Sequence, residues 1–98
     1  MEFSGFDWDA ANRAKRQKHG VTIAVIESLF LRGVLILPDA GHSQKEPRFL
    51  AIGRSGEGRA VFVVFTMRRQ GDERLIRPIS ARYMHKKEAA HYAETYKT

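Results

Sequence analysis

The amino-acid sequence predicts an α+β domain with two N-terminal helices, a roughly four-stranded antiparallel sheet and a C-terminal helix. Three features lead to this fold class. Apolar residues recur at helical spacing in the N-terminal third, β-rich runs separated by short glycine-containing segments fill the middle, and the end of the chain is again helical in composition. With 98 residues the chain has the length of one small domain, so we expect residues 1–98 to fold as a single unit.

The N-terminus begins with spaced aromatic residues and continues into a predicted helix. Residues 3–8 are expected to form a short strand or an anchored arm. A first helix is predicted over residues 10–18, because the carboxylate of Asp7 or Asp9 can accept hydrogen bonds from the free amides of a first turn. Gly20 is placed to end this helix in a left-handed conformation.

A second helix is predicted to begin after Thr22, whose hydroxyl suits an N-cap, and to end at Gly33. The apolar residues between these two positions recur every three or four residues and form one face of a helix. They are Ile23, Ile26, Leu29 and Phe30. The helix is therefore predicted to be amphipathic.

Beyond this helix the pattern changes to that of β-strands. A short run over residues 34–37 is followed by a predicted loop over residues 39–47, where glycine, serine and proline recur among polar residues. Three further strands are predicted over residues 48–54, 59–69 and 74–82. The connections between them are short and contain glycine, which favours antiparallel neighbours in a meander.

Two patterns place the strands and the last helix in the domain. Residues 60–65 are apolar at every position, so their strand is predicted to be central and covered on both faces. Pro78 has no N–H to donate, which places the last strand at a sheet edge or at a bulge. A final helix is predicted over residues 85–97 and is expected to lie against the sheet. The core is expected to include Leu50, Ile52, Val61, Val63 and Phe65.

The charge of the chain is positive and unevenly placed. The chain has 17 lysines and arginines and 11 acidic residues, which gives a formal net charge of +6. Residues 51–98 hold ten of the basic and five of the acidic residues, so five of the six net charges lie there. This excess indicates an anionic partner, such as a nucleic acid or an acidic protein, bound mainly by the later strands and the last helix.

The composition excludes several kinds of site. The chain has no cysteine, and therefore no disulfide, no cysteine-ligated zinc and no thiol nucleophile. The longest apolar run, residues 60–65, is far shorter than the roughly 20 residues that span a bilayer. His85, Glu88 and His91 are spaced too loosely around a helix to predict a metal site. We expect a cytoplasmic protein without a cofactor, a metal or a membrane partner.

A series of short motifs runs along the chain in a fixed order. They are Phe6-Asp7-Trp8-Asp9, Asn12, Lys18-His19-Gly20-Val21, Glu46-Pro47-Arg48, Ile52-Gly53-Arg54, Gly58-Arg59, Val63-Val64-Phe65-Thr66-Met67-Arg68, Ile79-Ser80-Ala81-Arg82, Lys86-Lys87-Glu88 and Tyr92. Taken together over residues 6–92, they resemble the BrnT toxins of bacterial type II toxin–antitoxin systems. The chain departs from the pattern of that family at Lys15, Tyr83 and Ala89-Ala90.

This resemblance implies a fold, an activity and partners. It implies a RelE-like architecture and a small ribonuclease that cleaves RNA and so stops translation and growth. The activity would be held in check by a cognate antitoxin, usually of the ribbon-helix-helix type (BrnA-like), in a hetero-oligomer. That complex would bind its operator DNA, with the antitoxin reading the DNA.

RNA cleavage without a metal uses the 2′-hydroxyl of the RNA as nucleophile, so the protein must supply proton transfer and positive charge. Lys18 and His19 are both predicted catalytic residues, and His19 is the first candidate for acid or base because histidine titrates nearest neutral pH. Arg48, Arg68 and Arg82 are candidates for holding the phosphate, because a guanidinium can bind two phosphate oxygens and stays charged. The alternatives are a helix cap for His19 and carboxylate-paired edge charges for the arginines.

Other charged residues are predicted either to contact the RNA or to have a structural role. Lys15, Arg59, Lys86 and Lys87 are predicted to contact the RNA. For the two lysines that open the last helix, a solvated helix face is the alternative. Glu46 is predicted to act either as an acid or base or as a structural partner of a nearby arginine.

Two other functions account for the same composition. A non-catalytic basic module could bind an antitoxin and nucleic acid in a transcriptional repressor complex, and it explains the charge of +6 equally well. The chain could also be a structural subunit that completes the fold of a partner through an exposed strand or its final helix.

Overall fold

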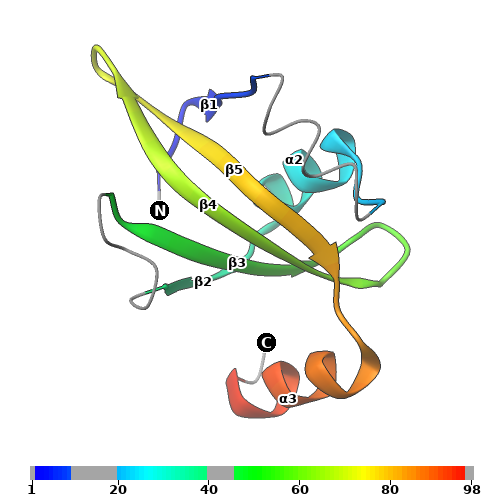
Figure 1. Cartoon of the computed structure of the whole chain (residues 1–98). Helices are drawn as coiled ribbons and strands as arrows, with labels where there is room; N and C mark the ends of the chain where they lie inside the picture. The colour runs from blue at the N-terminus through cyan, green and yellow to red at the C-terminus, as the bar shows by residue number, and fades with distance from the viewer. Residues whose placement is uncertain (1, 10–19, 40–45, 97–98) are drawn as a thin grey trace.

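The computed structural model describes residues 2–9, 20–39 and 46–96, which form five strands and two helices (Figure 1). In chain order these are β1 (Gly5–Phe6), α2 (Ile23–Arg32), β2 (Leu35–Pro38), β3 (Arg48–Arg54), β4 (Ala60–Gln70), β5 (Glu73–Tyr83) and α3 (Lys86–Tyr96). The second and last predicted helices and the four predicted strands are confirmed, with ends shifted by no more than one residue. The helix predicted over residues 10–18 lies outside the described residues.

The five strands form one mixed sheet in the order β1-β5-β4-β3-β2. Neighbours from β5 to β2 are antiparallel, whereas β1 lies parallel to β5, with Gly5 beside Leu75 and Phe6 beside Ile76. The predicted fold class is therefore wrong: the described residues hold one helix before the long strands, one helix after them, and a five-stranded mixed sheet instead of about four antiparallel strands. The parallel pair was missed because a two-residue strand has no periodicity, and its neighbour lies far along the chain.

Helix α2 begins and ends where its capping residues predict. The side-chain oxygen of Thr22 accepts a hydrogen bond from the backbone N–H of Val25 at 3.1 Å. At the other end, Gly33 has a φ of 109°, and its N–H donates to the carbonyl of Leu29 at 3.0 Å. Both ends of the helix are thus satisfied locally, and its apolar face is free to pack.

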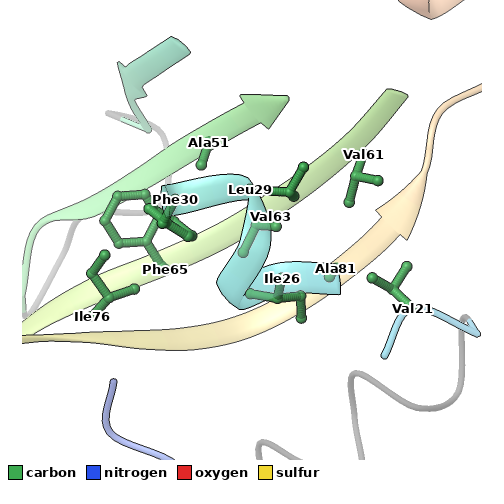
Figure 2. Packing of buried hydrophobic residues seen from close by; sticks show 10 residues of the cluster. All are labelled: Val21, Ile26, Leu29, Phe30, Ala51, Val61, Val63, Phe65, Ile76 and Ala81. Carbon is green, nitrogen blue, oxygen red and sulfur yellow. The ribbon is translucent and has the colours of Figure 1, made fainter. Parts of the chain in front are cut away.

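The core lies between α2 and one face of the sheet (Figure 2). The helix contributes Ile26, Leu29 and Phe30, and the central strand β4 contributes alternate side chains. The buried cluster consists of Val21, Ile26, Leu29, Phe30, Ala51, Val61, Val63, Phe65, Ile76 and Ala81. The aromatic residues Phe3, Phe6 and Trp8 of the N-terminal arm pack against this cluster, so their role is structural.

The opposite face of the sheet is less well covered. Leu50 and Ile52 of β3 pair in register with Val64 and Phe62 of β4, and all four side chains are only half-buried. The prediction that both faces of the central strand are covered is therefore wrong for this face, and so is the placing of Leu50 and Ile52 in the core. Opposite Val64 and Phe65 the register with β5 shifts, and β5 lies between β1 and β4, so of the two positions predicted for Pro78, a sheet edge or a bulge, the bulge is confirmed.

Helix α3 follows the end of β5 after a short connection (Figure 1). Its residues Ala89, Tyr92 and Ala93 line a hollow together with Leu35 and Ile52, at the face of the sheet that α2 leaves open. Within the described residues, neither helix is long and apolar enough to cross a membrane.

Candidate functional site: a basic hollow at the end of strand β5

Arg82 stands near the end of β5 and forms the best-defined ionic contact of the described chain. Its Nη1 and Nη2 donate to Oε1 and Oε2 of Glu88 at 2.7 and 2.8 Å, so the guanidinium and the carboxylate meet as a bidentate pair. Its Cζ also lies 5.0 Å from the ring centroid of Phe62, its neighbour across the sheet. These contacts hold the guanidinium in one position at the sheet surface.

Glu88 lies in the first turn of α3, where a carboxylate is favoured by the helix dipole. The hydrogen bond from Arg82 lowers the pKa of Glu88, and although burial opposes this shift, the charge of Arg82 and a hydrogen bond from the His85 backbone add to it. The same hydrogen bond raises the pKa of Arg82. Both groups are therefore charged at neutral pH, and the ion pair ties the start of α3 to β5.

Arg59 is positioned by the hairpin between β3 and β4. Ser55 is buried there, and its Oγ accepts hydrogen bonds from the backbone N–H groups of Glu57 and Arg59 at 3.3 and 3.2 Å. Gly58 has a φ of 82°, a conformation in which a residue with a side chain would be strained. The backbone of Arg59 is thus held by a closed turn, although its side chain is exposed.

The side chain of Arg59 reaches across to the last residue of β5. Its Cζ lies 3.6 Å from the ring centroid of Tyr83, which is a close cation–π contact. The backbone beside this contact is also fixed, because the N–H of Met84 donates to the carbonyl of Ala60 at 2.9 Å.

These residues surround one hollow of about 460 Å³, which we call the Arg82 hollow. It is lined by Arg59, Arg82, Tyr83, His85 and Glu88. Two guanidiniums can bind a phosphate, and an imidazole can transfer a proton near neutral pH. The hollow thus combines, within one small volume, the groups that RNA cleavage without a metal requires.

A larger hollow of about 530 Å³ lies between α3 and the β2–β3 side of the sheet. Arg32 and Arg54 are its only charged residues within the described part of the chain, and most of the remaining lining is apolar. Because no imidazole or carboxylate of the described residues lines it, this hollow is poorly suited to acid–base chemistry.

The structure brings together some of the predicted site residues and separates others. Arg59 and Arg82 line the same hollow. Arg68 and Arg82 lie on the same face of the sheet but far apart. Arg82 pairs with Phe62 of β4, and Arg68 lies six residues further along that strand, which corresponds to roughly 20 Å. Arg48 pairs with Thr66 and therefore lies toward the Arg68 end. Neither of these two arginines lines the Arg82 hollow.

The remaining predicted residues occupy other positions. Lys86 and Lys87 are exposed at the start of α3, directly before Glu88. Glu46 is exposed just ahead of β3 and does not line the hollow. Lys15, Lys18 and His19 lie outside the described residues.

The sequence did not predict three residues of the hollow as functional. Tyr83 is a departure from the family pattern, and His85 and Glu88 are considered in the sequence only for a metal site. The hydrogen bond from the His85 backbone to Glu88 is typical of a residue that caps the start of a helix. The pairing of Arg82 with Glu88 could have been predicted from the sequence, because an arginine near the end of a strand is followed by an acid in the first turn of the next helix.

Comparison with known proteins connects this arrangement to a family. A family model described as "Ribonuclease toxin, BrnT, of type II toxin-antitoxin system" matches residues 8–88. No curated protein gives a significant match. The matched segment covers most of the chain and includes every residue of the Arg82 hollow. The chain belongs to the BrnT family of ribonuclease toxins of type II toxin–antitoxin systems.

Proposed function

We propose that this chain is an endoribonuclease toxin that cleaves RNA without a metal, and that the scissile phosphate binds in the Arg82 hollow. The observation that carries this proposal is the meeting of two arginines, a histidine and a carboxylate in one hollow of about 460 Å³. Membership of a ribonuclease toxin family supports the activity, and the basic charge of the second half of the chain supports an anionic substrate.

In the proposed reaction the 2′-hydroxyl of the RNA attacks the adjacent phosphorus. His85 accepts the hydroxyl proton on an imidazole nitrogen while the bond between O2′ and phosphorus forms. The bond from phosphorus to O5′ then breaks, and the leaving oxygen takes up a proton. The products are a 2′,3′-cyclic phosphate and a 5′-hydroxyl. His19 is the proposed donor of that second proton, on the strength of its residue type and its motif.

The arginines act on the negative charge that grows on the phosphate oxygens. Arg82 is held by Glu88 through one edge of its guanidinium and offers its other N–H groups to the phosphate. Arg59 lines the same hollow and adds a second positive charge. Fixed cations of this kind stabilise a transition state more than a ground state, because they do not need to reorient when the charge develops.

The other predicted cations contribute positive charge to RNA binding. Lys86 and Lys87 stand directly before Glu88 at the start of α3, Lys18 belongs to the Lys18-His19-Gly20-Val21 motif, and Lys15 precedes that motif by three residues. Arg48 pairs with Thr66, and Thr66 and Arg68 lie four and six residues along β4 from Phe62, roughly 13 and 20 Å, so both arginines bind the RNA backbone toward that end of the sheet. In this proposal Glu46 is a structural partner near Arg48, not an acid or base.

Family membership also supports a control mechanism. We infer that the chain acts in the cytoplasm, where RNA cleavage inhibits translation and growth, and that a ribbon-helix-helix antitoxin (BrnA-like) neutralises it in a hetero-oligomer. That complex contacts operator DNA through the antitoxin. Co-expression with a ribbon-helix-helix protein encoded beside the toxin gene should restore growth, and failure of every such neighbour to do so would contradict this part of the proposal.

The activity is tested with purified protein and a single-stranded RNA in the presence of EDTA. We expect cleavage that EDTA does not slow, and products that carry 2′,3′-cyclic phosphates by mass spectrometry. His85→Gln and Arg82→Lys should each reduce the rate by about 100-fold or more. His91→Gln is the matched control, because His91 is an exposed residue of α3 that does not line the hollow.

The possible results separate the parts of the proposal. A fully active His85→Gln protein would rule out His85 as the base. Full activity of both hollow variants would place the reaction elsewhere on the chain. If the unmodified protein binds RNA in a salt-dependent manner but never cleaves it, the chain is a non-catalytic basic module instead.

A further inference from the structure

We propose that the stacked pair of Arg59 and Tyr83 is a binding site for one nucleobase of the RNA, next to the phosphate in the Arg82 hollow. The base would lie on the outer face of the Arg59 guanidinium, so that the guanidinium is held between the base and the tyrosine ring. This inference rests on the proposed function for the identity of the ligand. It adds a contact with a base to the phosphate contacts proposed for the Arg82 hollow.

The first support is the close packing of the Arg59 guanidinium on the Tyr83 ring. A separation of 3.6 Å between the guanidinium carbon and the ring centroid places the guanidinium against the face of the ring. Arg59 itself is exposed, so solvent can reach the guanidinium. Single-stranded RNA sites commonly use guanidinium planes and aromatic rings as stacking surfaces for unpaired bases.

The second support is that the backbone holds both residues before any ligand binds. Arg59 is fixed by hydrogen bonds of its N–H to the Ser55 side chain and of its carbonyl to the Ser55 N–H, the latter at 2.8 Å. The hydrogen bond from Met84 to Ala60 joins the residues next to Tyr83 and Arg59. A surface prepared in this way loses little conformational entropy when a base stacks on it.

The third support is the position of the pair relative to the charged groups. Arg59 and Tyr83 line the same hollow as Arg82, so a phosphate at Arg82 places its flanking base within reach of the stacked pair. The ring of Tyr83 covers one face of the Arg59 guanidinium, which leaves the opposite face for a base and the in-plane N–H groups for the phosphate. The pair is therefore better suited to a base than a free surface arginine is.

The test measures binding of a fluorescent single-stranded 2′-O-methyl oligonucleotide of adenines, in which the blocked 2′-hydroxyl prevents cleavage. A second oligonucleotide has the same phosphates but abasic sugars. The unmodified protein should bind the adenine chain about 5- to 100-fold more tightly than the abasic chain, as expected for the loss of base stacking.

Two pairs of variants separate stacking from charge. Arg59→Lys keeps the positive charge but has no planar group, and Tyr83→Leu removes the ring that supports the guanidinium. Both should lose most of the preference for the adenine chain, measured as the ratio of the affinities for the two chains. Tyr83→Phe keeps the ring and should retain the preference. Arg69→Lys is the control for an exposed arginine that does not line the hollow.

The proposal is overturned if the unmodified protein shows no preference for the adenine chain or does not bind it, or if Arg59→Lys keeps the full preference. Arg59 is exposed, so its lysine variant should fold, and matching thermal midpoints will establish this. Cleavage of unmodified RNA is measured separately. Base-dependent binding without cleavage would overturn only the proposed enzymatic function, whereas cleavage without base-dependent binding would overturn only this inference.

Discussion

Arg82 and Glu88 are joined by two parallel hydrogen bonds of 2.7 and 2.8 Å, which connect the end of the central sheet to the first turn of the last helix. The Glu88 side chain is 28% exposed and the Arg82 side chain 39%, so water screens part of their attraction. The pair therefore acts mainly by orientation: it directs one edge of Arg82 toward α3 and leaves the rest of the guanidinium for the hollow.

The first prediction concerns the pH dependence of stability. The pKa of Glu88 is lowered in the folded protein, so its ion pair stabilises the fold above the ordinary pKa near 4.5, and this contribution is lost as the pH falls through the lower folded-state pKa. Glu88→Gln should cost about 0.5 kcal/mol at pH 7 and almost nothing at pH 3, measured by urea unfolding. Glutamine can still accept the hydrogen bond from the His85 backbone, so the charge alone is removed.

Glu94→Gln is the control for this experiment, since Glu94 is an exposed carboxylate on the same helix. It should change stability less than Glu88→Gln at pH 7. A Glu88→Gln deficit that stays constant from pH 7 to pH 3 would show that the effect does not come from the charge.

A second prediction compares two leucines of α2 that differ only in their surroundings. Leu29 is fully buried and Leu31 is 79% exposed. Leu29→Ala should reduce the free energy of unfolding by about 2–5 kcal/mol, because it leaves a cavity between the helix and the sheet. Leu31→Ala should change it by no more than about 0.5 kcal/mol. Equal losses in denaturant unfolding would contradict the packing of α2.

The elements of the fold could be predicted wherever the signal is local. Thr22 and Gly33 mark the ends of α2 because capping depends on residues only a few positions away. The parallel pairing of β1 with β5 depends on contacts such as Phe6 with Ile76, whose partners are distant in the chain. No periodicity in two residues can signal such a contact, so the sheet was predicted with too few strands and without its parallel pair.

The site could be predicted in its residue types but not in its grouping. The register of β4 and β5 places Arg68 and Arg82 on one face of the sheet, whereas alternation along a single strand contains no information on how residues of two strands lie relative to each other. The contact of Arg82 with Glu88 depends on how the chain turns between β5 and α3, and the contact of Arg59 with Tyr83 depends on the register of β4 and β5. Both are tertiary relationships, which is why the hollow emerged only from the structure.

A third prediction follows from the distance between Arg68 and the Arg82 hollow. Arg68→Gln should weaken RNA binding and reduce the slope of log affinity against log salt by about 0.7, as expected for one lost contact to single-stranded phosphate. The cleavage rate at saturating RNA should stay within about threefold of the unmodified rate, in contrast to the loss of about 100-fold or more expected for Arg82→Lys. A large loss of rate at saturation for Arg68→Gln would move the reaction toward that end of the sheet.

A fourth prediction concerns the attachment of β1. Arg77 donates from Nη2 to Oδ2 of Asp9 at 2.8 Å, and its Nη1 lies 3.7 Å from Oδ2 of Asp7. Arg77→Gln should speed hydrogen exchange at the amides of Ser4 and Asp7, which donate to carbonyls of β5, by about two- to fivefold. Amides of β4 should be unaffected. Arg74→Gln, a change at an exposed position of the same strand, is the control, and equal acceleration in both variants would remove any special role for Arg77.

The last prediction concerns Thr66, which is 1% exposed in the middle of β4. Its Oγ1 meets no hydrogen-bond partner within the part of the chain that the structure describes. A buried hydroxyl without a partner costs free energy, so Thr66→Val, which keeps the branched shape and removes the hydroxyl, should raise the free energy of unfolding by about 1 kcal/mol. Thr66→Ser keeps the hydroxyl and removes a methyl group, and should lower stability by about 1 kcal/mol. Denaturant unfolding of the three proteins at neutral pH measures both changes. A valine variant less stable than the unmodified protein would show that the hydroxyl contributes an interaction to the fold, and the opposite order of the two variants would contradict the burial of the side chain.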